Sequence, residues 1–202
     1  MKKIIIIDYG MGNLFSIKSA CEKVGLEVNL SNDENEIMRS DAVILPGVGS
    51  FTEAMKKIKA KKIDKMLKKY ILTKKPIMGI CLGMQLFFEN SYEHKLTKGL
   101  GFIKGEVKLL DKNNYLNIGW HPVHKKKNHQ ITHNINDLSN MYFVHSYYCN
   151  PKNKDVILTE TNYFKFSFCS SVQQENLFGF QFHPEKSGEM GLNFYYNLRN
   201  LI

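Results

Sequence analysis

The chain has 202 residues, of which 43% are hydrophobic and 23% are charged. This composition predicts one compact domain with a real core, and no apolar run is long enough to span a bilayer. The formal net charge is +9, but Arg39 and Arg199 are the only arginines among many dispersed lysines. Because base-reading surfaces rely on arginine, the pattern argues against nucleic-acid binding as the main function.

The cysteines form no C-x-x-C pair and fit no zinc-site spacing; they are Cys21, Cys81, Cys149 and Cys169. A chain of this size needs no disulfide bonds, so we expect reduced thiols that mostly pack in the core. The apolar run of Met1–Ile7 ends at Asp8, which is too early for a secretory signal. We therefore expect a cytoplasmic protein.

The first half of the chain alternates short apolar runs with segments of helical periodicity. Strands are predicted at Lys3–Ile7, Ala42–Leu45 and Pro76–Ile80, and helices at Leu14–Val24, Phe51–Ile71 and Met84–Glu89. This alternation predicts an α/β fold with a largely parallel central sheet and helices on both faces.

The second half contains fewer helical segments. Strands are predicted at Phe102–Leu110, Met141–Tyr148, Val156–Thr161, Phe166–Val172 and Leu177–Phe182, and a closing helix at Gly191–Leu201. Antiparallel pairing is expected where strands follow one another without helices. Asp111–Asn140 is polar and predicts an irregular surface segment, and no repeat or linker divides residues 1–202 into further domains.

The strongest local signal for chemistry is Gly79-Ile80-Cys81-Leu82-Gly83, where a predicted strand ends and a helix begins. This is the cysteine form of the G-x-S-x-G nucleophile elbow, in which glycines leave room for a sharp turn. The helix N-terminus favours a thiolate at Cys81, and the amide of Leu82 would point at a developing oxyanion. A buried structural cysteine is the simpler alternative.

A second signal is His183-Pro184-Glu185 at the end of an apolar strand. Residues two apart in an extended chain face the same side, and Pro184 is expected to keep the backbone extended. Glu185 would then orient the imidazole of His183, which would transfer protons. An exposed polar strand end is the alternative.

A third signal is the glycine-rich turn Leu45-Pro46-Gly47-Val48-Gly49, which could supply a second oxyanion amide. Together the three segments predict a nucleophile, a base and an oxyanion hole. The histidines at 121, 124, 129 and 133 are interrupted by three lysines that would repel a cation, so neither a metal site nor a cofactor is predicted.

A redox or stress protein similar to DJ-1 is an alternative, because such proteins also carry a cysteine on an elbow. In them a histidine commonly follows the nucleophile directly. Here Leu82 follows Cys81, and His183 lies far downstream beside Glu185. That order favours acyl transfer from an amide.

Across nearly its whole length the chain resembles class I glutamine amidotransferases, and among them the HisH-type glutaminase subunits of imidazole glycerol phosphate synthase. The resemblance rests on five segments in the family's order: Ile6–Leu14, Leu45–Gly49, Gly79–Leu86, Tyr142–Tyr147 and Gly179–Ser187.

The resemblance implies that Cys81 attacks the side-chain amide of L-glutamine and that His183 protonates the departing ammonia. By the same resemblance, Gln85 and Glu93 bind the amino-acid part of glutamine. The pocket also includes the backbone of His145, Ser146 and Tyr147, and Gly49 and Leu82 frame the oxyanion hole.

In such enzymes the ammonia passes to a separate HisF-type synthase subunit, so the resemblance also implies a heterodimer. That subunit makes imidazole glycerol phosphate and AICAR, and glutaminase activity is expected to be weak without it. Asn13, Trp120 and Lys186 match positions on the partner-facing surface, although core packing is an equally simple role for the single tryptophan.

The segment Leu116-Asn117-Ile118-Gly119-Trp120-His121 departs from the family's usual Pro-His/Gln-x-Gly-Trp-Asn. The proline is missing, and His121 stands in place of the asparagine. This departure keeps open a related subunit that supplies ammonia to a sugar-amidating enzyme of surface-polysaccharide synthesis.

Overall fold

The computed structural model describes residues 2–110 and 116–202. The elements of the first half are β1 (Lys3–Ile7), α1 (Leu14–Lys23), β2 (Glu27–Ser31), α2 (Glu34–Arg39), β3 (Ala42–Leu45), α3 (Phe51–Ala60), α4 (Ile63–Ile71), β4 (Ile77–Ile80), α5 (Leu82–Gln85), β5 (Phe88–Ser91) and β6 (Thr97–Lys98). The later strands are β7 (Ile103–Leu109), β8 (Asn117–Lys125), β9 (Ser139–His145), β10 (Tyr147–Pro151), β11 (Ile157–Tyr163), β12 (Phe166–Gln174) and β13 (Leu177–Phe180). The 3₁₀ turns η1 (Gln130–Thr132), η2 (Lys154–Val156) and η3 (Pro184–Lys186) and the helix α6 (Gly188–Leu201) complete the described chain.

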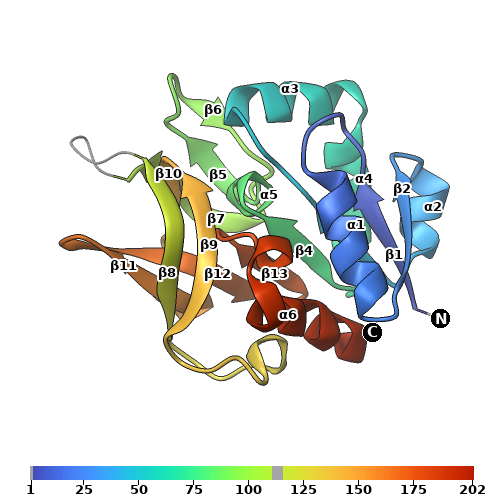
Figure 1. Ribbon diagram of the computed structural model, residues 1–202. Coiled ribbons are helices and arrows are strands. Elements are labelled where there is room, and N and C mark those ends of the chain that lie inside the picture. The colour runs from blue at the N-terminus through green and yellow to red at the C-terminus, as the bar shows by residue number, and fades with distance from the viewer. Residues whose placement is uncertain (1, 111–115) are drawn as a thin grey trace.

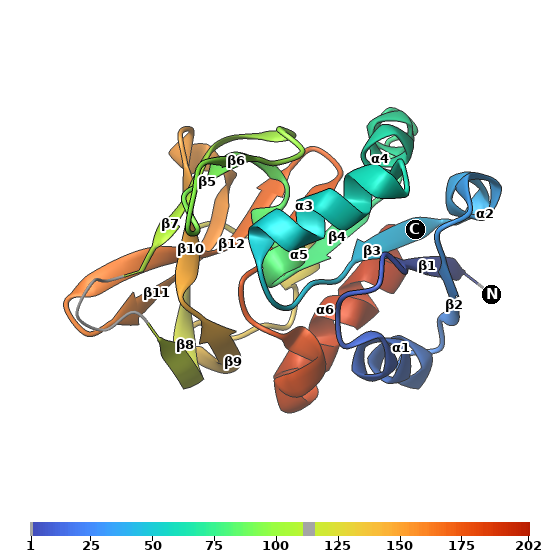
Figure 2. The same ribbon diagram turned by 90° about the horizontal axis from the view of Figure 1, so that it is seen from above.

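The central sheet has the order β2-β1-β3-β4-β13-β12-β10-β7-β5-β6 (Figure 1). Strands β2, β1, β3, β4 and β13 are mutually parallel, whereas β13, β12, β10 and β7 pair antiparallel. The predicted α/β fold, with a parallel first half and antiparallel strands in the second, is therefore confirmed. Strands β8 and β9 pair side by side at the end of the molecule away from β2 and α2 (Figure 2).

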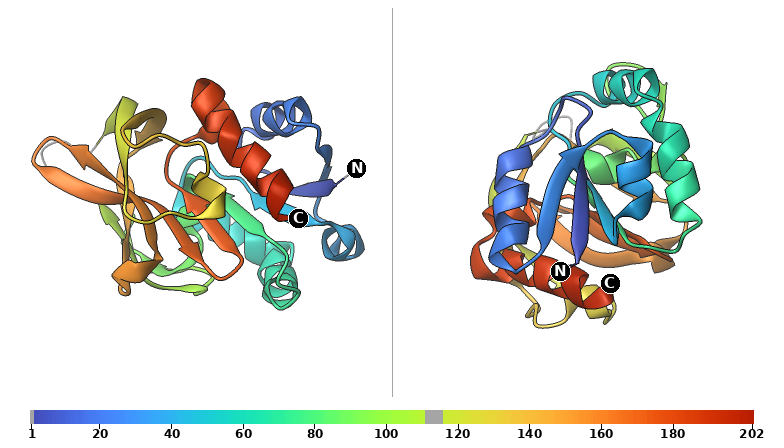
Figure 3. Two further views of the ribbon diagram at one scale, coloured as in Figure 1. Left: turned by 90° about the horizontal axis from the view of Figure 1, so that it is seen from below. Right: turned by 90° about the vertical axis from the view of Figure 1, so that its right-hand side faces the viewer.

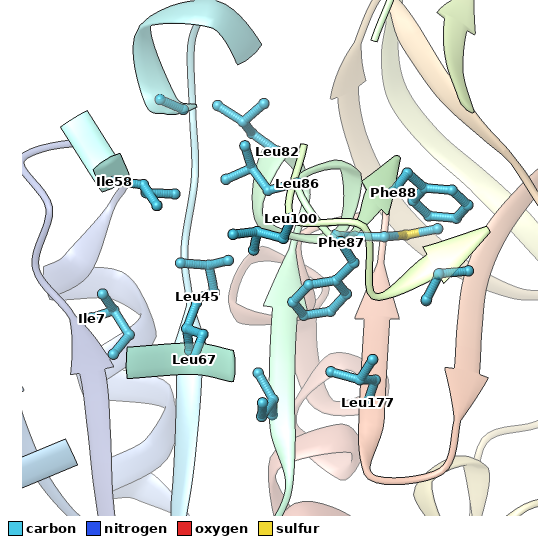
Figure 4. Close-up of a cluster of buried hydrophobic side chains, with 14 of the residues drawn as sticks. Ile7, Leu45, Ile58, Leu67, Leu82, Leu86, Phe87, Phe88, Leu100 and Leu177 are labelled. Atoms are coloured by element: carbon cyan, nitrogen blue, oxygen red, sulfur yellow. The ribbon is translucent and has the colours of Figure 1, made fainter. Parts of the chain in front are cut away.

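Helices cover both faces of the parallel strands (Figure 3). One face packs against α1 and α6 through a buried cluster that includes Ile17 and Phe194. The other packs against α3 and α4 through a cluster that includes Ile58 and Leu67, part of which is drawn in Figure 4. Strands such as β3 bury every residue because both of their faces are covered. Among the described residues, no helix is long and apolar enough to cross a membrane.

The helix predicted at Phe51–Ile71 is two helices. Lys62 lies between them with φ 57°, a left-handed conformation that ends α3. Ile58 and Ile63 are five residues apart, so a continuous helix would place them on different faces. The break allows both side chains to be fully buried.

The helix predicted at Met84–Glu89 is also wrong, because α5 ends at Gln85 and Phe88 begins β5. Leu86, Phe87 and Phe88 are consecutive and fully buried. A helix with one covered face cannot bury three successive side chains, whereas a chain that leaves the helix to join the sheet can. Strand β5 pairs with β7 in parallel and with β6 antiparallel.

The irregular segment predicted at Asp111–Asn140 lies partly outside the described residues, at 111–115. The described remainder contains β8, η1 and the start of β9, so the prediction is wrong there. Its polar residues mislead because β8 is exposed on one face, while its backbone pairs with β9 and β11. The strand predicted at Met141–Tyr148 is interrupted at Ser146, between β9 and β10.

Candidate active site

Cys81 lies at the sharp turn between β4 and α5. Its backbone has φ 53° and ψ −111°, a conformation that residues with a side chain rarely adopt. A Cβ atom on Gly83 would lie 1.9 Å from the carbonyl oxygen of Leu45, and one on Gly79 would lie 2.7 Å from the ring of Phe87. The strained turn therefore depends on both glycines, as a nucleophile elbow does.

The side chains of His183 and Glu185 are in contact with each other. His183 Nδ1 lies 2.7 Å from Glu185 Oε1, and their side chains are 3% and 0% exposed. The backbone is not extended at Pro184 as expected from the sequence. Pro184 begins the 3₁₀ turn η3, because the fixed φ of proline suits the first position of a helical turn. The turn still brings the two side chains together.

The electrostatics of His183 favour the imidazolium form. Burial lowers the pKa of His183, but interactions with Cys81 and Glu185 raise it more, to about 10. His183 Nε2 is buried without a partner at hydrogen-bonding distance in the described part of the chain. Such contacts often tighten only when substrate binds. The side chain can therefore supply a proton near the sulfur.

Cys81 opens into a cavity of about 390 Å³, a size suited to a small ligand. The structure brings most of the candidate residues to this cavity. Its lining consists of Val48, Gly49, Cys81, Leu82, Gln85, Glu93, Val144, His145, Ser146, Tyr147 and His183. Val48 and Val144 are lining residues that the sequence analysis did not single out.

Two backbone groups of this lining suit an oxyanion. The amide of Leu82 lies in the first turn of α5, where helical amides have no partner within the helix. Gly49 has φ +91°, a backbone conformation that glycine adopts easily and that allows its peptide to take orientations other residues rarely adopt. Both residues border the cavity beside the sulfur of Cys81.

Glu93 reaches the same cavity from the segment after β5. Its Oε2 accepts a hydrogen bond of 2.5 Å from the amide of Phe51, at the start of α3. This bond anchors one carboxylate oxygen to a helix N-terminus, where a negative charge is favourable. The other oxygen remains available for a cationic group of a ligand.

His145 is a structural group of the site. Its Nδ1 donates to the carbonyl of Tyr147 over 2.9 Å, so in the neutral ring Nε2 accepts from Asn117 Nδ2 over 3.0 Å. Burial, assisted by the charge of His183, lowers the pKa of His145 to about 3. His145 is therefore neutral and does not act as a base at physiological pH.

A pair of buried amides links this region to the nucleophile. Gln85 Nε2 donates to the carbonyl of Tyr147 over 2.9 Å and to Gln181 Oε1 over 3.0 Å. Gln181 Nε2 in turn lies 3.7 Å from Cys81 Sγ. The sequence analysis did not single out Gln181 or Asn117. The only signal for Gln181 is its place two residues before His183.

The candidate partner-facing residues lie outside the cavity. Trp120 is 54% exposed, and its ring centroid lies 5.9 Å from that of Tyr142. Lys186 Nζ lies 5.9 Å from the same tyrosine ring, so Trp120 and Lys186 share one surface. Asn13 caps α1 through a 3.4 Å bond from the amide of Ser16.

The histidines of the polar segment serve other contacts. The ring of His121 packs against Phe143 and Tyr163, and His129 caps η1. Within residues 2–110 and 116–202, no three potential metal-binding side chains of His, Cys, Asp or Glu come together.

This fold, with a thiol, an imidazole and a carboxylate gathered at one cavity, suits an amidotransferase. The family model described as glutamine amidotransferase class-I matches residues 5–198, and the chain belongs to this family. It is an enzyme that takes the amide nitrogen of glutamine.

More particularly, the chain is similar to proteins named imidazole glycerol phosphate synthase subunit HisH. It is 43% identical to the one from Aquifex aeolicus, over 98% of this chain and 96% of the relative. It is 42% identical to HisH 1 of Campylobacter jejuni, over 98% of this chain and 100% of the relative.

Among solved structures, PurLQS from Thermotoga maritima has a TM-score of 0.79 at 19% identity, with 98% of each chain covered, and supports the fold alone. The relatives favour neither the sugar-amidating subunit nor the DJ-1-like protein.

Proposed function

We propose that residues 1–202 form the glutaminase subunit of an imidazole glycerol phosphate synthase. The observation that carries the proposal is the placement of a strained Cys81 beside the buried His183–Glu185 pair, at the wall of a small cavity. The similarity to HisH proteins over almost the full chain supports the acceptor pathway. Four free, buried cysteines agree with a reducing cytoplasmic location.

In the proposed first half-reaction, Cys81 Sγ attacks the side-chain carbonyl carbon of glutamine. The amides of Gly49 and Leu82 stabilise the oxyanion of the tetrahedral intermediate. The carbon–nitrogen bond then breaks, and the protonated His183 gives its proton to the leaving nitrogen, so that ammonia departs. Glu185 holds the imidazole through Nδ1 and stabilises its charge.

In the second half-reaction, the neutral His183 takes a proton from water, which attacks the thioester. The carbon–sulfur bond breaks, glutamate is released and His183 is left protonated beside the sulfur. Gln85 and Glu93 hold the amino-acid part of the substrate, as their position on the cavity wall allows.

The function is tested by glutamate release from purified protein with its partner subunit. Cys81→Ala is expected to lower kcat by about 10⁴-fold or more. Cys169→Ala is the matched control, because this thiol is buried in β12 away from the cavity lining. Undiminished glutamate release by Cys81→Ala contradicts the proposal.

An apolar strip that begins just before β8 and continues along it supports a HisF-type partner beside the site. Leu116, Ile118 and Trp120 alternate along the chain and are each more than half exposed. Across the strands, Trp120 pairs with Tyr142 and Ile118 with Val144, and Val144 also lines the catalytic cavity. A partner that covers this strip would therefore lie beside the catalytic cavity, where it could receive ammonia.

Binding of a HisF-type subunit tests this surface. Trp120→Ala is expected to weaken Kd by roughly 30-fold, since exposed tryptophans at interfaces often contribute about 2 kcal/mol. Leu72→Ala is the control, because Leu72 is 77% exposed at the end of α4. Equal affinity of wild type and Trp120→Ala excludes the strip from the interface.

The packing of Met11 against Gly49 supports the expectation that glutaminase activity is weak without the partner. A Cβ atom on Gly49 would lie 3.2 Å from Met11 Cε, so the loop that precedes α1 packs against the proposed oxyanion glycine. Asn13, a proposed partner contact, follows Met11 closely in the chain. A partner that moves this loop would alter the orientation of the Gly49 peptide. We expect glutamate release to rise when the partner is added, and to rise less in Met11→Ala.

A further inference from the structure

The hydrogen bonds of Gln85 and Gln181 form a chain with two fixed ends. At one end is the backbone carbonyl of Tyr147, which can only accept. At the other end is the sulfur of Cys81, which accepts from Gln181 Nε2 over 3.7 Å because its own proton is directed at the carbonyl of Val144, 3.9 Å away. Gln181 is fully buried and Gln85 is 6% exposed, so water cannot readily replace either bond.

These ends determine the orientation of both amides. Gln181 turns its NH₂ group to the sulfur and therefore its Oε1 to Gln85. Gln85 must then direct one N–H to Gln181 Oε1 and the other to the carbonyl of Tyr147. A flipped Gln181 would place its oxygen against the lone pairs of the sulfur, and a flipped Gln85 would place its oxygen against a carbonyl.

Both N–H groups of Gln85 are thus engaged, and its carbonyl oxygen is the group left for a ligand in the cavity. Glu93, on the same cavity wall, presents a carboxylate. Two acceptors together match an ammonium group, which has three donors and no acceptor. A ligand that lacks this ammonium would leave both acceptors without a partner, at a cost in affinity.

We propose that Gln181 is a positioning residue that orients Gln85 as an acceptor for the α-ammonium group of the substrate. Gln181 thereby determines specificity for α-amino acids over their des-amino counterparts. This inference rests on the proposed glutaminase function and deepens it.

The test uses labelling of Cys81 in the full-length chain, which needs no turnover. One probe is a diazo-ketone analogue of glutamine, and the other is the same diazo ketone without its α-amino group. Mass spectrometry gives the concentration of each probe for half-maximal labelling rate. The wild type is expected to prefer the amino probe by at least tenfold. Gln181→Met is expected to reduce this preference by roughly tenfold.

A second variant and a double-mutant cycle separate positioning from general damage. Gln181→Glu retains an oxygen that can accept from Gln85. Its second oxygen would face the sulfur and slow labelling by both probes alike, so the preference between the probes is expected to be mostly kept. In a Gln85→Leu background, Gln181→Met is expected to cause no further loss of preference. Gln173→Met, at a half-buried glutamine of β12 that does not line the cavity, is the control and should match wild type.

An unchanged preference in Gln181→Met overturns the inference, as does an equal loss in Gln181→Glu or an additive loss in the Gln85→Leu background. These outcomes leave the proposed glutaminase intact. Failure of the wild type to label at Cys81 with the amino probe counts instead against the glutaminase itself.

Discussion

Because His145 is neutral in the folded protein, we expect the free energy of unfolding to fall in acid. Its ordinary pKa is 6.5, and burial lowers the pKa to about 3 in the folded protein. The unfolded chain therefore binds a proton at this residue between these values while the folded chain does not. Stability contributed by the neutral ring is present above pH 6.5 and falls as the pH drops toward 3.

The size of this loss of unfolding free energy follows from the lowered pKa of His145. Each pH unit below 6.5 costs about 1.4 kcal/mol of unfolding free energy at this residue. At pH 4.5 the cost is about 2–3 kcal/mol. Rotation of the Asn117 amide could let its oxygen accept from a protonated Nε2, but it would not remove the burial of the charge, which is the main cause of the shift.

The assay is urea unfolding of wild type and His145→Gln at pH 7.0, 5.5 and 4.5. The variant loses a well-bonded ring and is expected to be less stable at pH 7.0 by about 1–2 kcal/mol. This difference should vanish or reverse by pH 4.5, because glutamine does not titrate. His133→Gln, at an exposed histidine, serves as the control. A stability difference that stays constant from pH 7.0 to 4.5 refutes the reasoning.

Three further changes test the site and the fold. Gly83→Ala should abolish glutamate release and lower the unfolding free energy by roughly 3 kcal/mol or more, as measured in urea, because its Cβ would overlap a backbone oxygen. Lys62→Gly should raise the melting temperature, because glycine adopts the left-handed backbone at this position without the strain of about 1 kcal/mol that a lysine has there. Lys61→Gly should lower it, because Lys61 has an ordinary φ of −90° and glycine only adds flexibility there. Glu185→Gln should lower kcat at least about 100-fold and, by NMR titration, move the pKa of His183 down from about 10, since the raising charge is lost. An unmoved pKa would assign the shift to Cys81 alone.

The parts of the site whose residues lie close together in the chain could be predicted from the sequence. The elbow at Cys81 follows from a strand, two glycines and a helix start that are contiguous in the chain. The pair of His183 and Glu185 was predicted from spacing, although η3 rather than an extended strand brings the side chains together. In both cases the interacting groups are a few residues apart.

The contacts between distant segments could not be predicted in this way. Strand β13 lies parallel to β4, with Phe180 opposite Ile80. This register places the residues that follow β13 beside those that follow β4, and so brings Gln181 to Cys81 and Gln85. Neither strand carries a local feature that specifies its neighbour. Asn117 likewise meets His145 only because β8 pairs with β9.

Of the two imidazoles near Cys81, only that of His183 is held in the charged form. His145 is uncharged because burial opposes a second imidazolium and the charge of His183 repels one. The amides of Gln85 and Gln181 carry no charge either, yet they direct donors at the sulfur and at the Tyr147 carbonyl. The sulfur of Cys81 is thus surrounded by one charged imidazole and by fixed dipoles. Since only His183 carries a proton that it can lose, the proposed amide cleavage would have a single proton donor, and the cavity would retain acceptors for the ammonium of the substrate.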